Sequence, residues 1–339
     1  MAILPAVCSD TSERPLFERA LLWEKRLRAA TTPGDLVERY RGAMTACELS
    51  DWRAEALFLR LLANYIDNEG AVAFCDVDAD GDFDALWTDA GATQVWRNDA
   101  GVFVPTGEPG LSAGIDLSGE NVDGLACGDV DNDGDVDIFL STAGGPGYLF
   151  VNRTAPGAAS PLAFTRDNAG IALDATIPSV AFGDYDGDGD LDLVAASDDG
   201  TNQLWQSHWD DSGRADYLQV RVLHPLVGGA ARDEIGATVR LFEADGTTPV
   251  GPVQEVNGGR GYGSQAAAVL HFGLPSGPDR GYVVEVRFLE ECGRPGPVVR
   301  QEIVPSSLGA PQVLEVMRPP DGGGKGRHEC SCGPRRRER

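Results

Sequence analysis

The apolar residues follow a different pattern in each part of the chain. In residues 1–66 they recur every three or four positions, which predicts two or three short helices. Between 67 and 215, short apolar runs alternate with polar turns, as in short β-strands. Residues 216–318 carry longer β-type runs. Residues 319–339 are glycine-rich and then basic, which predicts a disordered tail.

The segment 67–215 repeats one order of elements three times. A short apolar run precedes an acidic loop, a second run follows it, and a third lies a few residues further on. The runs are 71–74, 85–87 and 94–98 in the first repeat, 124–127, 138–140 and 148–152 in the second, and 179–182, 193–195 and 203–206 in the third. Several short strands in each repeat of about fifty residues are typical of a β-propeller blade.

The segment 216–318 is predicted to be a separate β domain. Its apolar runs are 217–223, 238–243, 253–256, 269–272, 283–288 and 298–304. Glycine, proline and aspartate separate these runs at the spacing of a β-sandwich.

The predicted fold class is mainly β. It combines a partial or capped β-propeller with a C-terminal β-sandwich-like domain and a short N-terminal helical segment. Closed propellers have about four to eight blades, so three repeats leave open strand edges that must be covered. Either the helical segment and the C-terminal domain cap the open blades, or strands from 216–316 complete the ring.

A nine-residue acidic loop stands at the same place in each repeat, and its starting points are 53 and 55 residues apart. Aspartate occupies positions 1, 3, 5, 7 and 9, and glycine occupies position 6. Carboxylates this close repel one another unless a cation neutralises them, and calcium accepts about six to eight oxygen ligands. The sequence therefore predicts about three bound Ca²⁺ ions. The candidate ligands are Asp76, Asp78, Asp80, Asp82, Asp84, Asp129, Asp131, Asp133, Asp135, Asp137, Asp184, Asp186, Asp188, Asp190 and Asp192.

The loop positions also predict how the ion is held. The glycine at position 6 supplies the backbone angles of a tight turn. The carbonyl of position 7 then faces the ion while its side chain points to solvent, and the aspartate of position 9 closes the shell. An EF-hand is excluded because it requires Glu at position 12, where this chain has Trp87, Leu140 and Ala195. The alternatives are solvated acidic turns without an ion, and magnesium, which rarely fills an all-protein site.

These repeats resemble the FG-GAP, or VCBS-type, repeat of β-propellers. The Phe-Gly pair of that repeat stands before the loops as Phe74-Cys75, Cys127-Gly128 and Phe182-Gly183, intact in the third copy. The C-terminal segment resembles the ASPIC/UnbV domain in the stretches 217–222, 232–237, 263–265, 270–274 and 284–288. The combination is similar to bacterial relatives of the cartilage acidic protein. It implies calcium binding and an extracellular, periplasmic or cell-surface setting, without an established reaction.

The chain is strongly acidic. Its 53 Asp and Glu against 28 Lys and Arg give a net charge of −25, and three Ca²⁺ ions (+6) would leave about −19. This charge argues against binding of nucleic acid, which requires basic contacts, and against docking on anionic membranes. No segment has the ~18 consecutive apolar residues of a membrane span. Residues 1–10 lack the charged start and apolar stretch of a secretory signal.

The cysteines and histidines give no metal-binding or catalytic pattern. Seven cysteines are too few for a disulfide-built scaffold and too scattered for a zinc site. Cys127 takes the place of a phenylalanine and is expected to be a buried core residue, while Cys8 and Cys47 can pair in an oxidising compartment. None of the four histidines stands at ligand spacing from another, and a structural role is expected for His271.

These observations favour a calcium-stabilised binding or adhesion module, whose ligand is a protein or carbohydrate of the cell surface or matrix. Self-association is also possible for an open propeller. No nucleophile, base and orienting residue form one constellation, so no catalytic residue is predicted. The alternative is an enzyme or biosynthetic accessory protein, a lyase- or dehydratase-like propeller acting on a carbohydrate or natural product. A cleft near His271, Tyr262 and Arg260 would favour that alternative.

Overall fold

The computed structural model describes residues 72–320 with internal gaps. The gaps are 90–91, 100–101, 106–114, 116, 118–121, 143–144, 155–161, 168–170, 172–178, 198–201, 210–215, 258–266 and 290–294. The predicted helical segment 1–66 with its two cysteines, the tail beyond 320, Arg260 and Tyr262 lie outside the described residues. Within the described residues, no helix has the length and apolar character to cross a membrane.

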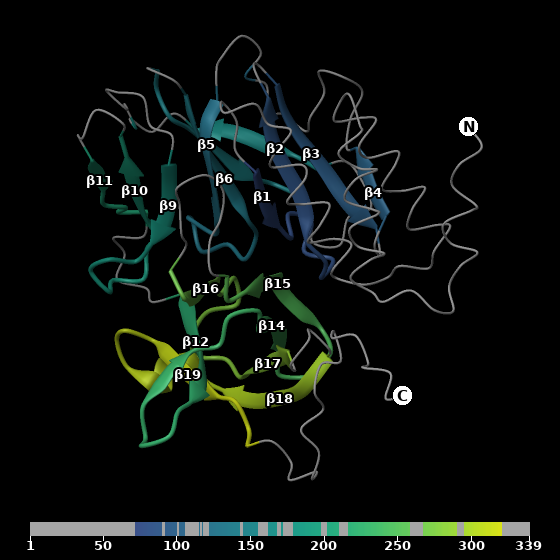
Figure 1. Ribbon diagram of the computed structural model, residues 1–339, viewed down its shortest axis with the longest axis vertical. Helices are drawn as coiled ribbons and strands as arrows, with labels where there is room; N and C mark the ends of the chain where they lie inside the picture. Colours follow the sequence, from purple (N-terminus) through teal and green to yellow (C-terminus); the bar gives the residue numbers. More distant parts are fainter. Residues whose placement is uncertain are drawn as a thin grey trace, which may run out of the picture. The chain divides into compact units, whose positions relative to one another are not determined.

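Each acidic repeat forms one antiparallel sheet whose strands follow one another in chain order (Figure 1). The first sheet contains β1 (Val72–Cys75), β2 (Asp84–Asp89), β3 (Ala92–Asp99) and β4 (Val102–Pro105). The second contains β5 (Val122–Gly128), β6 (Asp137–Thr142), β7 (Tyr148–Asn152) and β8 (Phe164–Asp167), and the third contains β9 (Ser179–Gly183), β10 (Asp192–Ala196) and β11 (Gln203–Trp205). The three apolar runs predicted in each repeat are confirmed as strands. The outer strands β4 and β8 were missed, because an edge strand of four residues carries little alternation of apolar and polar positions.

The three blade sheets pack face to face through apolar side chains. Successive residues of a strand point to opposite faces, and β6 is buried on both of them. Leu140 therefore packs in one cluster with Leu86 of the first blade, whereas Phe139 packs in another with Leu193 of the third. Each such buried side chain contributes about 1.5–3 kcal/mol to folding. Because both faces of the middle blade are packed, its strands consist of continuous apolar runs and do not alternate between apolar and polar residues.

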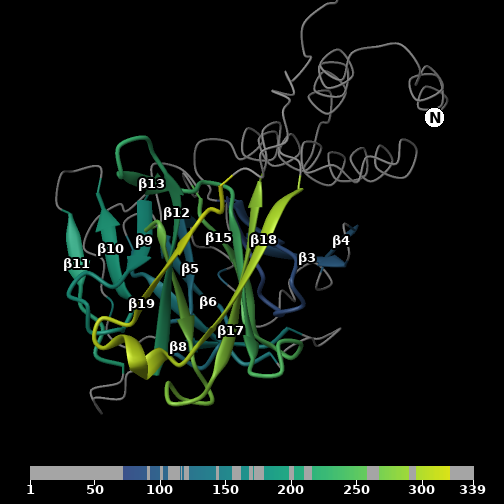
Figure 2. The same ribbon diagram turned by 90° about the horizontal axis from the view of Figure 1, so that it is seen from below.

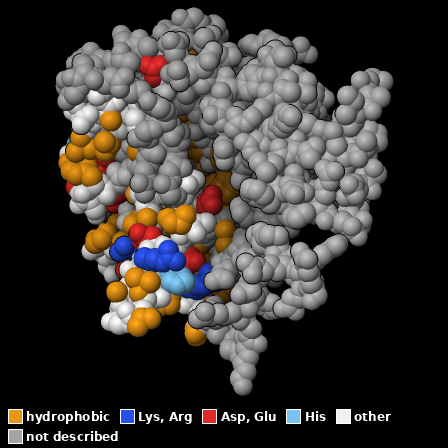
Figure 3. All heavy atoms as spheres, viewed as in Figure 1, with side chains coloured by type: hydrophobic (Ala, Val, Ile, Leu, Met, Phe, Trp, Pro, Cys, Tyr) orange, Lys and Arg blue, Asp and Glu red, His pale blue; other side chains and the backbone are white. Residues whose placement is uncertain are grey.

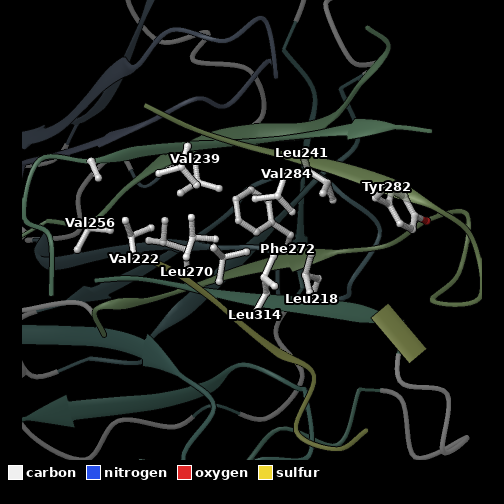
Figure 4. Packing of buried hydrophobic residues seen from close by; sticks show 14 of the residues in the cluster. Leu218, Val222, Val239, Leu241, Val256, Leu270, Phe272, Tyr282, Val284 and Leu314 are labelled. Carbon is white, nitrogen blue, oxygen red and sulfur yellow. The ribbon is translucent and has the colours of Figure 1, made fainter. Parts of the chain in front are cut away.

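The C-terminal domain is a sandwich of two sheets, as predicted (Figure 2). One sheet has the order β13–β12–β16 with β19 parallel to β12, and the other has the order β15–β14–β17–β18. The bounds are β12 (Tyr217–Pro225), β13 (Ala231–Asp233), β14 (Thr238–Glu243), β15 (Pro249–Glu255), β16 (Val269–Gly273), β17 (Tyr282–Leu289), β18 (Pro295–Ile303), the 3-10 helix η2 (Pro305–Leu308) and β19 (Val313–Met317). Leu218, Val239, Phe272 and Val284 from the two sheets meet in the core between them (Figure 4).

The C-terminal domain contacts the acidic loops of the blades and adds no strand to their sheets. Within the described residues its strands pair only with one another. Its strands β12, β15 and β16 instead supply hydrogen-bond donors to the acidic loops that follow β9, β1 and β5, respectively. Blades of a propeller are separate sheets, so this pairing agrees with either predicted arrangement, and the helical segment of the predicted cap lies outside the described residues.

A disulfide joins Cys75, at the end of β1, to Cys127 in β5. The prediction that Cys127 is a buried core residue was wrong, because this residue is half-buried and bonded to Cys75. Both cysteines replace a member of the Phe-Gly pair, and the two replacements are partners of each other. A cysteine at this pair in each of two adjacent repeats was the signal in the sequence that pointed to the bond.

We expect the Cys75→Ala/Cys127→Ala double variant to lose about 2–4 kcal/mol of unfolding free energy, because the bond closes a loop with a separation of 52 residues. Urea unfolding in the presence of calcium measures the loss. A reducing agent should destabilise the parent chain and leave the double variant unchanged. Equal stability of the two proteins would contradict a structural role for the bond.

Candidate metal centre

The three acidic loops share one backbone conformation. The glycine at position 6 has a φ of 102° at Gly81, 93° at Gly134 and 98° at Gly189, which confirms the predicted turn. Position 4 is also left-handed, and here Ala79 (φ 54°) and Asn132 (φ 55°) adopt a conformation that side chains disfavour. These two left-handed positions let the chain turn within a few residues, so that alternate carboxylates converge.

The carboxylates that converge are those of positions 1, 3 and 9. In each loop one oxygen of each lies within 4.8 Å of the others, in the groups Asp76–Asp78–Asp84, Asp129–Asp131–Asp137 and Asp184–Asp186–Asp192. Position 5 lies outside these groups. Its Oδ1 accepts the N–H of position 7 instead, at 3.0 Å for Asp80, 3.2 Å for Asp133 and 3.0 Å for Asp188. The structure thus brings together three of the five predicted ligands of each loop.

The side chains of position 7 do not follow the prediction that they point to solvent. Asp190 is buried, and its Oδ1 accepts a hydrogen bond from Asn132 Nδ2 at 3.4 Å. Asp135 is half-buried and its Oδ1 is inaccessible to solvent. Asp82 is also half-buried. For Asp190 the prediction was wrong because it considered the loop alone, whereas Asn132 of the neighbouring loop contacts this side chain.

The aspartate of position 9 ties its loop to the third strand of the blade. In the second repeat, Asp137 Oδ2 accepts the N–H of Val130 at 2.9 Å and Oδ1 accepts the N–H of Asn152 at 2.8 Å. The same pair of bonds recurs in the first repeat, where Asp84 accepts from Val77 and Asn98. It also recurs in the third, where Asp192 accepts from Tyr185 and Ser207. This carboxylate therefore has a structural role besides any part in metal binding.

The aspartate of position 1 joins its loop to the C-terminal domain. In each loop its Oδ2 accepts the N–H of the position-6 glycine, at 3.0–3.1 Å. The same oxygen accepts a second hydrogen bond from the domain. The donors are Val253 N to Asp76 at 2.7 Å, Gly273 N to Asp129 at 2.9 Å and Gln219 Nε2 to Asp184 at 2.8 Å. The three loops thus contact the domain through one equivalent atom.

In the first and second loops, carboxylate oxygens without a hydrogen-bond partner fit a cation, whereas Asp184 Oδ1 of the third loop accepts the N–H of Gly187 at 2.7 Å. Oδ1 of Asp76, Asp129 and Asp131 is buried and accepts no hydrogen bond from any described residue. A buried charged oxygen without a partner is strongly destabilising, and a bound cation removes that penalty. The donors are all oxygens, which is the preference of calcium. The residues present therefore fit a calcium ion.

Burial raises the pKa of several carboxyls in the first and second loops when no cation is bound. Desolvation raises the pKa of Asp76 to about 7 and those of Asp84 and Asp137 to about 8. The pKa of Asp129 also rises well above its ordinary value, through burial first and then through repulsion by the other aspartates of its loop. Without metal, the first and second loops therefore retain protons near neutral pH, and a cation must displace them.

Basic or amide groups lie at the edge of each loop. Arg153 Nη1 is 3.2 Å from Asp131 Oδ2 and 3.1 Å from Asp133 Oδ2, and Arg97 Nε is 3.8 Å from Asp78 Oδ2. In the third loop a neutral amide, Gln206, takes this place. These groups contact Oδ2 and leave Asp131 Oδ1 without a partner. They offset part of the loop charge and do not replace a cation.

Buried asparagines connect neighbouring loops. Asn152 Nδ2 donates to the carbonyl of Val77 in the first loop at 2.9 Å, and Asn132 Nδ2 donates to the carbonyl of Gly189 in the third at 3.2 Å. Asn132 Oδ1 accepts a hydrogen bond from His271 Nε2 at 2.7 Å. His271 is buried and stacked on Tyr217, which supports the predicted structural role. Sequence reasoning missed both asparagines, although Asn98 and Asn152 end equivalent strands.

Glycine is required at position 6 for a second reason besides the turn, because a side chain there would meet the C-terminal domain. A Cβ at Gly189 would lie 1.9 Å from the ring of Tyr217, and one at Gly81 would lie 1.9 Å from the guanidinium of Arg240. At Gly134 the nearest atom belongs to Pro275, at 3.0 Å. All three neighbours belong to the C-terminal domain, so the glycines also allow it to approach the loops.

We expect Gly189→Ala to lower the unfolding free energy by about 1–3 kcal/mol more than Gly187→Ala, because overpacking costs that much. Gly187 is the matched control, since it also has a positive φ (80°) but would place its Cβ in open space. Both variants carry the backbone strain, and only the first meets Tyr217. Urea unfolding in calcium measures the difference, and equal losses would contradict the close approach.

We expect a chain stripped of metal to become less stable as the pH rises from 6.5 to 8. The pKa values of Asp76, Asp84 and Asp137 lie near 7–8 in the fold against an ordinary 3.8, so the folded state binds more protons and loses stability as they dissociate. Below pH 6.5 His271, whose pKa is lowered to about 4 by burial, opposes this trend. In 2 mM calcium the slope should vanish or reverse, because acid displaces the ion. Melting curves in EDTA and in calcium test this, and parallel pH profiles would contradict it.

The fold and the loops define a propeller-type repeat protein with metal-loop motifs between the first and second strands of its blades. The family model of the FG-GAP-like repeat matches residues 76–140 and 129–195, and that of ASPIC and UnbV matches residues 228–288. The chain therefore contains FG-GAP-like repeats followed by an ASPIC/UnbV domain. The matched repeats contain all three acidic loops.

No curated protein matches the chain. Among solved structures it is similar to a Tc holotoxin pore of Photorhabdus luminescens, at 16% identity over 66% of this chain and 10% of that chain, with a TM-score of 0.28. It is also similar to a TcdB2–TccC3 structure without the hypervariable C-terminal region, at 15% identity over 70% of this chain and 11% of that chain, with a TM-score of 0.28. The chain spans about a tenth of the length of these structures. TM-scores this low carry no argument about its fold or function.

Proposed function

We propose that the chain is a calcium-dependent binding module of the cell surface or extracellular space, with one ion in each acidic loop. The observation that carries this proposal is the position-1 carboxylate. Its Oδ2 holds the C-terminal domain, and in Asp76 and Asp129 its Oδ1 is buried without a partner among the described residues. An ion at Oδ1 stabilises the loop and the domain contact together. The FG-GAP-like repeats favour the extracellular setting.

The expected stabilisation by calcium is large. Extracellular calcium modules have affinities of roughly 0.1–1 mM. Millimolar calcium then adds about 1–2 kcal/mol per site by mass action. Three sites give about 3–6 kcal/mol, a large part of the stability of an ordinary domain. In this proposal calcium has a structural role, and the ligand is a protein or carbohydrate that docks on the blades or on the C-terminal domain.

The enzyme alternative has one supporting feature, a cavity lined by His271, but the candidate reactive side chains are engaged elsewhere. His271 is buried, and its Nε2 is engaged by Asn132. Cys75 and Cys127 are bonded to each other and offer no thiol. Arg260 and Tyr262, which would have completed a site with His271, lie outside the described residues.

We expect 2 mM calcium to raise the melting temperature of the chain by at least ~5 °C over EDTA, because each kcal/mol is worth roughly 2–4 °C in a domain of this size. Magnesium should have a much smaller effect. Asp131→Asn should remove roughly a third of the rise, because it weakens one of three equivalent sites. Calorimetry or circular dichroism measures the shift.

Asp279→Asn is the matched control for this experiment. It removes the same charge at an exposed position outside the loops, so the rise with calcium should be that of the parent chain. No rise in the parent, or the same rise in Asp131→Asn as in the control, would refute the proposed calcium sites.

A further inference from the structure

A cavity of about 410 Å³ lies where the inner strands of the blades meet the C-terminal domain. One wall comes from the loop ends of β1, β5 and β9, and the other comes from β12, β15 and β16. Val194 and Tyr185 line it and are 45% and 54% exposed. Hydrophobic side chains also gather on the surface over β9–β11 (Figure 3). The cavity therefore opens to solvent beside the third blade.

Most of the lining is apolar. Phe74, Phe182 and the Cys75–Cys127 disulfide contribute to the blade wall, and Val269 and Leu270 contribute to the domain wall. Pockets for small molecules have volumes of about 300–1,000 Å³ and walls of this kind, with a few polar groups that fix the orientation of the ligand. The cavity has the size and the lining to hold a molecule with a compact aromatic or alicyclic body.

Two glutamine side chains line the cavity, and hydrogen bonds from their Nε2 atoms set the orientation of their amide groups. Gln219 Nε2 donates to Asp184 Oδ2 at 2.8 Å, and Gln254 Nε2 donates to the backbone carbonyl of His271. A carboxylate and a carbonyl only accept hydrogen bonds, so each amide must turn its NH₂ group toward them. The Oε1 atoms of Gln219 and Gln254 are then left to accept hydrogen bonds from another molecule.

The hydrogen bonds around His271 also leave this side chain with an acceptor, its Nδ1 atom. Asn132 Nδ2 donates to the carbonyl of Gly189, so the group that faces His271 Nε2 is the amide oxygen of Asn132. His271 Nε2 must therefore carry the proton, and Nδ1 is an acceptor. This Nδ1 is buried and has no hydrogen-bond partner among the described residues. Burial also lowers the pKa of His271 to about 4, which keeps the ring neutral at ordinary pH.

The described lining also lacks the basic side chains that would favour a ligand with hydrogen-bond acceptors. No Lys or Arg is among the described residues that line the cavity. The hydroxyl of Tyr185 at the mouth can donate as well as accept. We propose that this cavity binds a small molecule with an aromatic or alicyclic body that donates hydrogen bonds through an amino or hydroxyl group. A molecule of the same shape that ends in a carboxylate is disfavoured, because Gln219 Oε1, Gln254 Oε1 and His271 Nδ1 offer it only acceptors.

This inference goes beyond the proposed function, which places metal in the loops and a macromolecular ligand on the surface. It rests on that function in one respect, since the position-1 carboxylates join the two walls of the cavity. We therefore expect binding to the calcium-loaded chain. Measuring the calcium-dependent rise in melting temperature on the same sample separates the failure of one proposal from the failure of the other.

The test is calorimetric titration of the full chain in 2 mM calcium with tryptamine, tryptophol and indole-3-acetate. The three probes share one ring system and end in an ammonium, a hydroxyl and a carboxylate. Tryptamine and tryptophol should bind, and indole-3-acetate should bind at least ~10-fold more weakly, a difference of about 1.4 kcal/mol. Equal binding of all three probes would overturn the acceptor character of the cavity, and binding of none would overturn the site.

Two variants locate the binding. Val194→Trp places a large ring at the mouth of the cavity and should weaken binding of tryptamine at least ~10-fold. Leu204 is the matched control, since it faces Val194 across the β10–β11 pair, is 51% exposed and lies outside the lining. Leu204→Trp should leave binding unchanged, and both variants should keep the calcium-dependent rise. An equal loss in both variants would overturn the location.

Tryptamine binding without any calcium-dependent rise in melting temperature would refute the proposed calcium sites and leave the proposed cavity site intact.

Discussion

The described fold depends on three carboxylates that serve two parts of the chain at once. Oδ2 of Asp76, Asp129 and Asp184 accepts one N–H from its own loop and one from the C-terminal domain. In Asp76 and Asp129 the other oxygen is buried without a partner among the described residues. Such a group is stable only when a proton or a cation satisfies it. The state of each loop is therefore coupled to the contact between the blades and the domain.

Neighbouring features follow from this coupling. The position-6 glycines give the loops their turn and also leave room for Tyr217, Arg240 and Pro275 of the C-terminal domain. Buried amides such as Asn132 satisfy carbonyls between one loop and the next. Because the domain meets the blades at their loop ends, a partly apolar space remains between the inner strands and the domain sheets. The proposed calcium sites and the proposed ligand cavity are thus adjacent and share the position-1 carboxylates.

Local features of the sequence predicted a large part of this structure. The repeated loop and its flanking apolar runs predicted three strands in each blade, because alternation and turn residues act over a few positions. They also predicted that the carboxylates of each loop converge, and the structure brings together those of positions 1, 3 and 9 but not that of position 5. The edge strands β4 and β8 were missed because burial imposes little pattern on an edge. The Cys75–Cys127 bond was missed because each cysteine was considered within its own repeat, although the pair stands in adjacent ones.

The sequence by itself determined the number of acidic loops, their spacing, the left-handed glycine in each and the β character of both segments. All of these are set by residues close together in the chain, through backbone torsions and the alternation of side chains. The tertiary structure decided which carboxylate oxygen meets the domain, how Gln219 and His271 are oriented, and where the cavity opens. These contacts join residues from different sheets, such as Asp76 and Val253, which are 177 positions apart. Only the packing of the blades against the domain brings such residues together, so no local pattern encodes them.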